Sequence, residues 1–326
     1  AMFTNRSTAV SVAGANRAYG VDAAFSFFQN VGFAAYYART ETPGLASDSD
    51  SYQGIADYGG DRYGGHLEYL KVGNNFNPEI GFVSRVNFGR TYATARFSPR
   101  PRSLKAVRKF TYQANLDNFV NGGGELETRI SSGQFSAELE NSDVFAIIVA
   151  SDFERLARPA AILGVTIPEG SHQFTNTLAT YAFGAQRRVS GTLLLQTGDF
   201  YNGTLTSVGY SAARVSVLKQ FSFEPTVSLN RVVIPGSTVT TRLYRTRADY
   251  AFSPLMFTTA LLQYTSTDRA FSSNLRFRWE YRPGSELFVV YTDERDLTDP
   301  RFALPSQVLG LRNRAFVVKI NRLMRF

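Results

Sequence analysis

The chain has 326 residues, of which 44% are hydrophobic, 14% are aromatic and none is cysteine, and its formal net charge is +8. Its longest apolar run, Val144–Ala150, is far shorter than the roughly 18 residues that a transmembrane helix needs, so a membrane crossing would have to use strands. The 35 basic residues are spread through the chain rather than gathered in one run, which argues against nucleic acid as a partner.

Alternation of apolar and polar residues predicts strands through the first third of the chain. Tyr19–Phe28 and Val31–Thr40 form one predicted hairpin, and Ser51–Tyr58 and Arg62–Val72 form the next around a Gly-Gly-Asp turn. Asn74–Arg90 lacks this alternation and contains Asn, Pro and Gly, the composition of a long connection. Its apolar side chains are too many for a fully solvated loop, so we expect this connection to pack against the rest of the protein.

The middle of the chain continues the same pattern. Thr91–Ser98 and Lys109–Asp117 alternate almost strictly, and Val144–Glu154 places its large apolar residues on one face. Arg158–Ser171 contains two prolines and is predicted to be a long loop. Further predicted strands follow at short intervals, over residues 172–183, 189–197, 203–217, 221–232, 238–252 and 255–265.

The clearest strand pair is Asn274–Glu294. Its first strand alternates aromatic and aliphatic residues with charged ones, and Pro283-Gly284 supplies a tight turn before the second strand. One face then carries large apolar side chains and the opposite face is rich in arginine. Such a strand is typical of a sheet with lipid on one side and water on the other.

Short and long predicted links alternate along the chain. Gly184–Arg187 and Pro283-Gly284 are short, whereas Arg158–Ser171, Thr267–Ser273 and Asp293–Asn313 are long. This alternation is expected of an up-and-down barrel that has short turns at one end and longer loops at the other.

We therefore predict an all-β fold, a transmembrane antiparallel up-and-down β-barrel in the bacterial outer membrane, as a single domain over residues 1–326. The sequence predicts about 18 strands, within a range of roughly 16 to 18, each crossing with roughly 9 to 11 residues. A larger barrel, of which these strands form a part, stays open as an alternative.

Three stretches resemble one family: FNPEIGFVSRVNFGR at Phe76–Arg90, YAFSPLMFTTALLQY at Tyr250–Tyr264 and SSNLRFRWEYRPGSELFVVYTDERD at Ser272–Asp296. They resemble bacterial proteins with an N-terminal carbohydrate-binding-module family-nine-like domain, in their C-terminal barrel region, a domain of unknown function. The resemblance covers essentially the whole chain, without the module. It implies an outer-membrane barrel with no known activity, and it admits a periplasmic module or partner protein as a partner.

The last strands carry two further signals. The chain ends in Phe326, and a final strand ending in phenylalanine resembles the signal by which outer-membrane barrels are recognised by the barrel-assembly machinery. Trp279 and Tyr281 lie beside a predicted turn, which suits girdle aromatics at the membrane interface. The expected partners are thus outer-membrane lipid, lipopolysaccharide and the assembly machinery.

The charged residues of the predicted inward face suggest the function. We expect a lumen lined by Arg96, Lys109, Arg129, Arg245, Arg247, Arg276, Arg278, Glu280 and Arg282. If the lumen is open, this basic wall attracts anionic solutes. If the lumen is closed, cross-strand ion pairs between these side chains and facing acids would fill it. The leading hypothesis is a channel or translocation component for solutes, and the alternative is a non-conducting scaffold that anchors a periplasmic module or partner.

The Asn74–Arg90 connection is a candidate constriction of that lumen. A loop packed on the rim of the barrel is the alternative, and the sequence favours neither. The candidate constriction residues are Phe76, Asn77, Glu79, Phe82, Arg85 and Arg90.

Catalysis has little support in the sequence. The chain has two histidines, His66 and His172, and neither stands in a nucleophile motif. We interpret both as structural, and an outer-membrane hydrolase is the least favoured function. No histidine pair stands at the spacing of a metal site. Carboxylates at Asp48–Asp50 or Asp293–Asp299 stay open as calcium ligands, although loop carboxylates are usually only solvated. We expect no catalytic residue, no metal and no cofactor.

Overall fold

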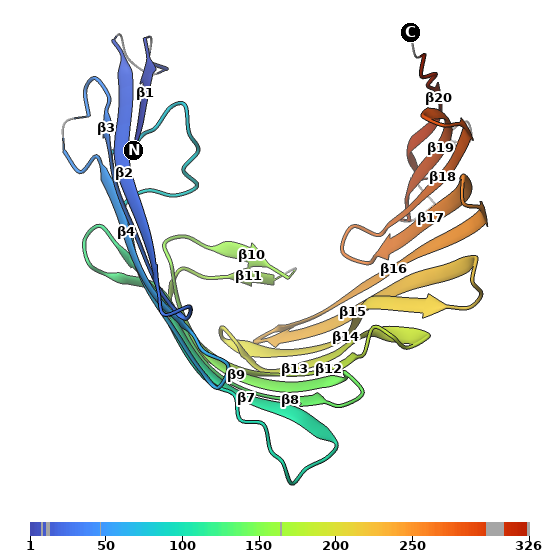
Figure 1. Ribbon diagram of the computed structural model, residues 1–326, viewed down its shortest axis with the longest axis horizontal. Helices are drawn as coiled ribbons and strands as arrows, with labels where there is room; N and C mark the ends of the chain where they lie inside the picture. The colour runs from blue at the N-terminus through green and yellow to red at the C-terminus, as the bar shows by residue number, and fades with distance from the viewer. Residues whose placement is uncertain (8, 11–13, 46, 164, 298–309, 325–326) are drawn as a thin grey trace. The chain divides into compact units, whose positions relative to one another are not determined.

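The computed structural model describes residues 1–7, 9–10, 14–45, 47–163, 165–297 and 310–324. In this part of the chain every regular element is a β-strand, and the strands run up and down in an antiparallel sheet of 18 strands (Figure 1). The predicted all-β, up-and-down architecture is thereby confirmed. Within the same residues no strand pairing closes the sheet.

The chain divides into two compact units, which are described separately. The first consists of Ala1–Ala137, Ile147–Ala160 and Ile167–Thr177, and the second of Glu138–Ala146, Ala161–Thr166 and Leu178–Phe326. Helices that could span a membrane are absent from the residues that the structure describes.

The first unit contains β1 (Met2–Arg6), β2 (Asn16–Phe27), β3 (Val31–Glu41), β4 (Asp50–Gly59), β5 (Tyr63–Val72), β6 (Phe88–Phe97) and β7 (Val107–Asn121). Five strands contribute to both units, namely β8 (Leu126–Leu139), β9 (Val144–Leu156), β10 (Ala160–Ile162), β11 (Val165–Ile167) and β12 (Gly170–Phe183). The second unit contains β13 (Val189–Phe200), β14 (Gly203–Ser216), β15 (Phe221–Ile234), β16 (Ser237–Ser253), β17 (Met256–Thr265), β18 (Ala270–Arg282), β19 (Ser285–Asp296) and β20 (Leu311–Ile320).

In the first unit, strand register gathers apolar side chains on one face of the sheet. Phe33 lies opposite Phe25 and Ala56, and Leu67 lies opposite Ala56 and Ala93. These side chains are not covered, since Phe33 is 47% exposed and Leu67 is 56% exposed. A water-soluble sheet would pack such a face against a core. We call this face, and its counterpart in the second unit, the apolar face, and the opposite one the polar face.

The second unit repeats this arrangement around β18. Leu275 lies opposite Ala260 and Tyr291, whereas its neighbour Arg276 lies on the other face, opposite Thr259 and Val290. Leu275 is 46% exposed and Trp279 is 44% exposed. The alternation predicted for Asn274–Glu294 is therefore confirmed, and an irregular register between Glu280 and Arg282 ends it at the turn.

Fully buried side chains are mostly polar in the described residues. Asn16 (2% exposed), Thr40 (1%) and Asp143 (1%) are among them, and Ile167 and Val232 are the largest apolar ones. These buried polar side chains are hydrogen-bonded within the sheet and its links.

Two of the predicted long links are wrong in part. Residues 158–171 contain a short hairpin of β10 (Ala160–Ile162) and β11 (Val165–Ile167), and β12 already starts at Gly170. Thr267–Ser273 is a tight turn rather than a long loop, because β18 begins at Ala270 and Phe271 pairs with Tyr264. Most of the Asp293–Asn313 link lies outside the described residues.

Candidate functional site

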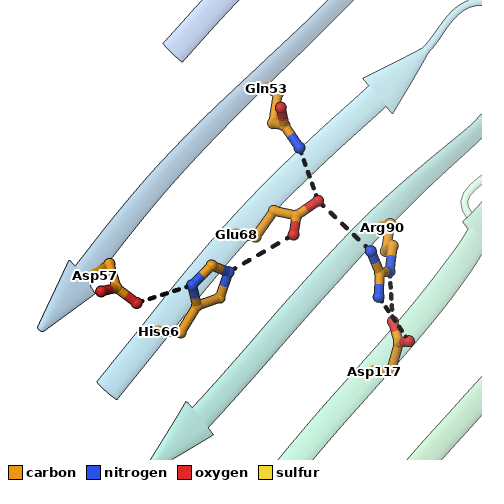
Figure 2. A network of polar contacts seen from close by, with 6 residues as sticks. All are labelled: Gln53, Asp57, His66, Glu68, Arg90 and Asp117. Atoms are coloured by element: carbon orange, nitrogen blue, oxygen red, sulfur yellow. Dashed lines mark hydrogen bonds and ion pairs between the residues drawn. The ribbon is translucent and has the colours of Figure 1, made fainter. Parts of the chain in front are cut away.

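A connected group of charged and polar side chains lies on the polar face of the first unit. Figure 2 shows its six members, which come from β4, β5, β6 and β7. Direct cross-strand pairing brings Asp57 opposite His66 and Tyr92 opposite both Glu68 and Asp117. We call this group the β4–β7 network, and its members are Gln53, Asp57, His66, Glu68, Arg90 and Asp117.

Arg90 is the centre of the β4–β7 network. Its Nε and Nη2 atoms donate to the two carboxylate oxygens of Asp117 at 2.7 and 2.9 Å, and its Nη1 lies 3.6 Å from Oε1 of Glu68. The guanidinium also lies over the rings of Tyr92 and Phe119, 5.0 and 5.4 Å from their centroids. A bidentate ion pair combined with stacking requires the planar guanidinium of arginine, which lysine does not provide.

His66 bridges two carboxylates. Its Nδ1 lies 3.2 Å from Oδ1 of Asp57 and its Nε2 lies 3.7 Å from Oε2 of Glu68, while Gln53 donates to the other oxygen of Glu68 at 2.9 Å. The second histidine, His172, has its Nε2 3.0 Å from the carbonyl oxygen of Pro168. Neither contact involves a hydroxyl or thiol that a histidine base would activate.

The connection between β5 and β6, residues 73–87, contacts side chains of the polar face at the start of β2 and near the end of β3. The Nδ2 of Asn16 donates to the carbonyl of Asn77 at 2.8 Å, and the amide of Asn77 donates to Thr40 Oγ1 at 3.0 Å. Glu79, whose side chain is 4% exposed, accepts from the amide of Val10 at 3.0 Å and lies 3.7 Å from Arg6. These contacts explain why Asn16 and Thr40 are buried.

The C-terminal part of the same connection is held at a second place. Arg85 forms an ion pair with Glu127 and lies over the ring of Phe119, 5.6 Å from its centroid. The tip between the two anchors leaves Phe82 90% exposed. Of the candidate constriction residues, Asn77, Glu79 and Arg85 thus anchor the connection, Phe82 lies at its tip, Arg90 belongs to the β4–β7 network, and Phe76 closes a turn to Gly73.

Five of the predicted lumen residues share the polar face of the second unit. Register places Arg245 opposite Gln263, Arg247 opposite Leu261 and Arg276 opposite Thr259, and it continues this face to Arg278 and Glu280. Arg278 pairs with Glu286 and Arg247 lies 3.0 Å from Asp249. Among the described residues, Arg245 and Arg276 have no ion-pair partner.

The other predicted positions have separate surroundings. Arg96 donates to the carbonyls of Asp61 and Gly60 at 3.0 and 2.5 Å. Arg129 lies over the ring of Phe153 at 6.0 Å, and Arg282 pairs in register with Ser285. Lys109 stands on β7 with the spacing that places it on the face of Asp117.

The predicted girdle aromatics contact each other next to the turn between β18 and β19. The rings of Trp279 and Tyr281 are 6.0 Å apart, edge to face. Tyr281 also donates to the carbonyl of Asn321 at 2.9 Å. Phe326, the predicted assembly signal, lies outside the described residues.

Asp143, between β8 and β9, is an anchoring residue that the sequence reading does not identify. Its carboxylate accepts from the Gly184 amide at 2.8 Å, the Tyr181 hydroxyl at 2.7 Å and Arg187 at 2.6 Å. The Gly184 amide, followed by Tyr181 and Arg187, holds the pKa of Asp143 below its usual value although burial opposes this shift. An Asn-Ser-Asp sequence in a link is compatible with many solvated turns, so only the folded geometry identifies it.

The polar faces of both units carry charged side chains, many of them joined in ion pairs. In the part of the chain that the structure describes, no group of three or more acidic, histidine or cysteine side chains could hold a metal ion. Comparison with protein-family models, with curated proteins and with solved structures finds no match for this chain. The resemblance to the barrel region of the module-bearing bacterial proteins therefore stays a prediction.

Proposed function

We propose that this chain forms an outer-membrane β-barrel that works as a channel or translocation component for solutes. The observation that supports it is the pair of unlike faces. Aromatic and aliphatic side chains such as Phe33, Leu67, Leu275 and Trp279 are about half exposed on one face, and the opposite face carries arginines and carboxylates. If such a sheet closes with its apolar face outward, the apolar side chains contact lipid and the polar side chains contact water in the lumen.

The polar face would then act on solutes through its charge. Arginine side chains that project into a water-filled lumen raise the local concentration of anions and repel cations. The connection 73–87, anchored across the polar face of the first unit, supports a narrowing of that lumen by backbone and by the exposed Phe82.

A scaffold that conducts nothing is the second candidate, and a specific observation favours it. In the first unit, charged side chains of the polar face form ion pairs with one another, as in the Arg90–Asp117 and Arg85–Glu127 pairs. A fully paired interior resembles a filled core more than a pore. The barrel would then anchor a periplasmic module or partner protein.

Planar-bilayer recording separates the two candidates. The chain is purified in detergent, checked for folding by its shift in electrophoretic mobility on heating, and added to bilayers in potassium chloride. We expect stepwise conductance from the folded protein and none from a heat-denatured sample. Folded, membrane-inserted protein that conducts no ions would reject the channel and leave the scaffold.

A further inference from the structure

Strand β14 contains an extra residue beside β13. Ser190 pairs with Arg214 and Thr192 pairs with Ser211, so that Gly191 alone faces two residues of β14. One of these, Ala212, has a φ of 48°, a left-handed conformation that is uncommon for a residue with a side chain. Two neighbouring strands thus share a β-bulge, a device that re-aims side chains and recurs next to binding sites.

The bulge is fixed by its surroundings. A Cβ atom on Gly191 would lie 2.8 Å from Cα of Ala213, so a larger residue does not fit there. The hydroxyl of Tyr210 donates to the carbonyl of Ser190 at 2.8 Å. A strained residue held in place by its neighbours is a reason to look for a function.

The bulge changes which face Arg214 occupies. Before it, Val208 and Tyr210 lie on the apolar face, opposite Leu195 and Leu193. Continued alternation would put residue 214 on that face as well. After the bulge, however, Val215 pairs with Phe223, so Val215 takes the apolar face and Arg214 turns to the polar one.

Arg214 thereby joins two other arginines around one pocket. The pocket has a volume of about 600 Å³, within the range of small-molecule sites. Its charged and hydroxyl-bearing lining residues are Ser190, Arg214, Glu224, Thr226, Arg245 and Arg247.

Two of these arginines are left with unused donors. The guanidinium groups of Arg214 and Arg245 make no ion pair or hydrogen bond within the described residues, whereas Arg247 pairs with Asp249. Glu224, opposite Arg247 in register, is the one acid of the lining. The contrast is Arg90 in the first unit, whose donors are taken by Asp117.

We propose that this pocket binds a soluble oxyanion, a carboxylate or phosphate compound with several acceptor oxygens. Two free guanidinium groups match such oxygens in pairs, and the hydroxyls of Ser190 and Thr226 lie in the same wall. The inference deepens the proposed channel by naming its substrate class. Binding to solubilised protein needs no conduction, so either proposal can fail while the other stands.

The test is titration calorimetry of the folded, detergent-solubilised chain with pyrophosphate and, separately, citrate at low salt. We expect saturable binding that weakens about tenfold or more in the double variant R214Q/R245Q. The matched control is R231Q/R242Q, which removes two arginines of the same unit from the apolar face, where Arg231 pairs with Thr240 and Arg242 with Leu229. The control is expected to bind within about twofold of the unmodified chain.

The outcomes are distinct. Binding of pyrophosphate alone assigns a phosphate compound, binding of citrate alone assigns a carboxylate, and binding of both supports the wider oxyanion class. Absence of binding to both probes, or an equal loss in the control variant, overturns the site and leaves the channel proposal to the bilayer recording. If the double variant does not fold, R245Q alone replaces it, since that side chain has no described partner to lose.

Discussion

At the scale of single residues, one carboxylate connects four neighbours. Asp143 is 1% exposed and receives hydrogen bonds from the backbone amide of Gly184, the hydroxyl of Tyr181, the guanidinium of Arg187 and the side-chain amide of Asn141. Replacing it with asparagine keeps the size but removes the charge and one acceptor oxygen. The donors of Gly184, Tyr181, Arg187 and Asn141 use both carboxylate oxygens, whereas asparagine offers one acceptor oxygen. At least one buried donor is then left unsatisfied, which destabilises the folded state.

We therefore expect the variant D143N to unfold at a lower temperature than the unmodified chain above about pH 5. Since the folded pKa of Asp143 lies below its ordinary value of 3.8, its stabilising effect is fully present above that value and is lost as the pH falls through the folded pKa. The difference between the two proteins should then shrink in acid, as measured by thermal unfolding in detergent from pH 6 to pH 2.5. A difference that stays constant down to the lowest pH would argue against this role.

The β4–β7 network makes a second prediction at this scale. R90Q leaves Asp117 and Glu68 as neighbouring carboxylates without their common cation, and we expect a loss of about 1–3 kcal/mol in the free energy of unfolding. R90K should recover part of it, because an ammonium retains the charge but not the bidentate geometry. Chemical denaturation of the three proteins measures this; equal stability of R90Q and the unmodified chain would show that the network is not stabilising.

At the scale of elements, the connection 73–87 is the one loop with a proposed part in conduction. Deleting Asn77–Asn87 removes the Glu79 anchor, the Arg85 anchor and the exposed Phe82 together. If the connection narrows the lumen, the deletion raises the single-channel conductance in planar bilayers. Conductance that is unchanged, in a variant that still inserts and folds, would place the loop on the rim instead.

The elements also show what a sequence can and cannot predict. Period-two alternation identified β7 and the β18–β19 hairpin, because each residue's face follows from its parity. It did not identify the β14 bulge, because residues 203–217 read as one strand and only the pairing of β14 with β13 shows where the extra residue lies, at Gly191. Each strand of the β10–β11 hairpin has three residues, which is too short to show a period-two alternation. The partners of Asn77 and Glu79 are distant in the chain, so local sequence does not predict these contacts.

At the scale of the whole molecule, the formal net charge is +8, and the arginines that contribute to it differ in their surroundings. Arg90 and Arg85 form ion pairs with Asp117 and Glu127. In the described residues, no ion pair is formed by Arg214, Arg245 or Arg276. A channel with this wall should therefore prefer anions. In a potassium chloride gradient we expect a reversal potential whose sign shows selectivity for chloride over potassium. This selectivity should be weaker at high salt, because exposed charges are screened. A cation-selective pore would contradict this assignment of the polar face.

The most direct test of the two-faced sheet uses the absence of cysteine from the chain. Single cysteines are placed at Asn274, Leu275, Arg276 and Phe277 of β18, and the protein is reconstituted into liposomes and exposed to a water-soluble maleimide. We expect the residue 274 and 276 variants to react and the residue 275 and 277 variants not to react, since register puts the latter on the apolar face. Equal reactivity at all four positions in folded, inserted protein would contradict it.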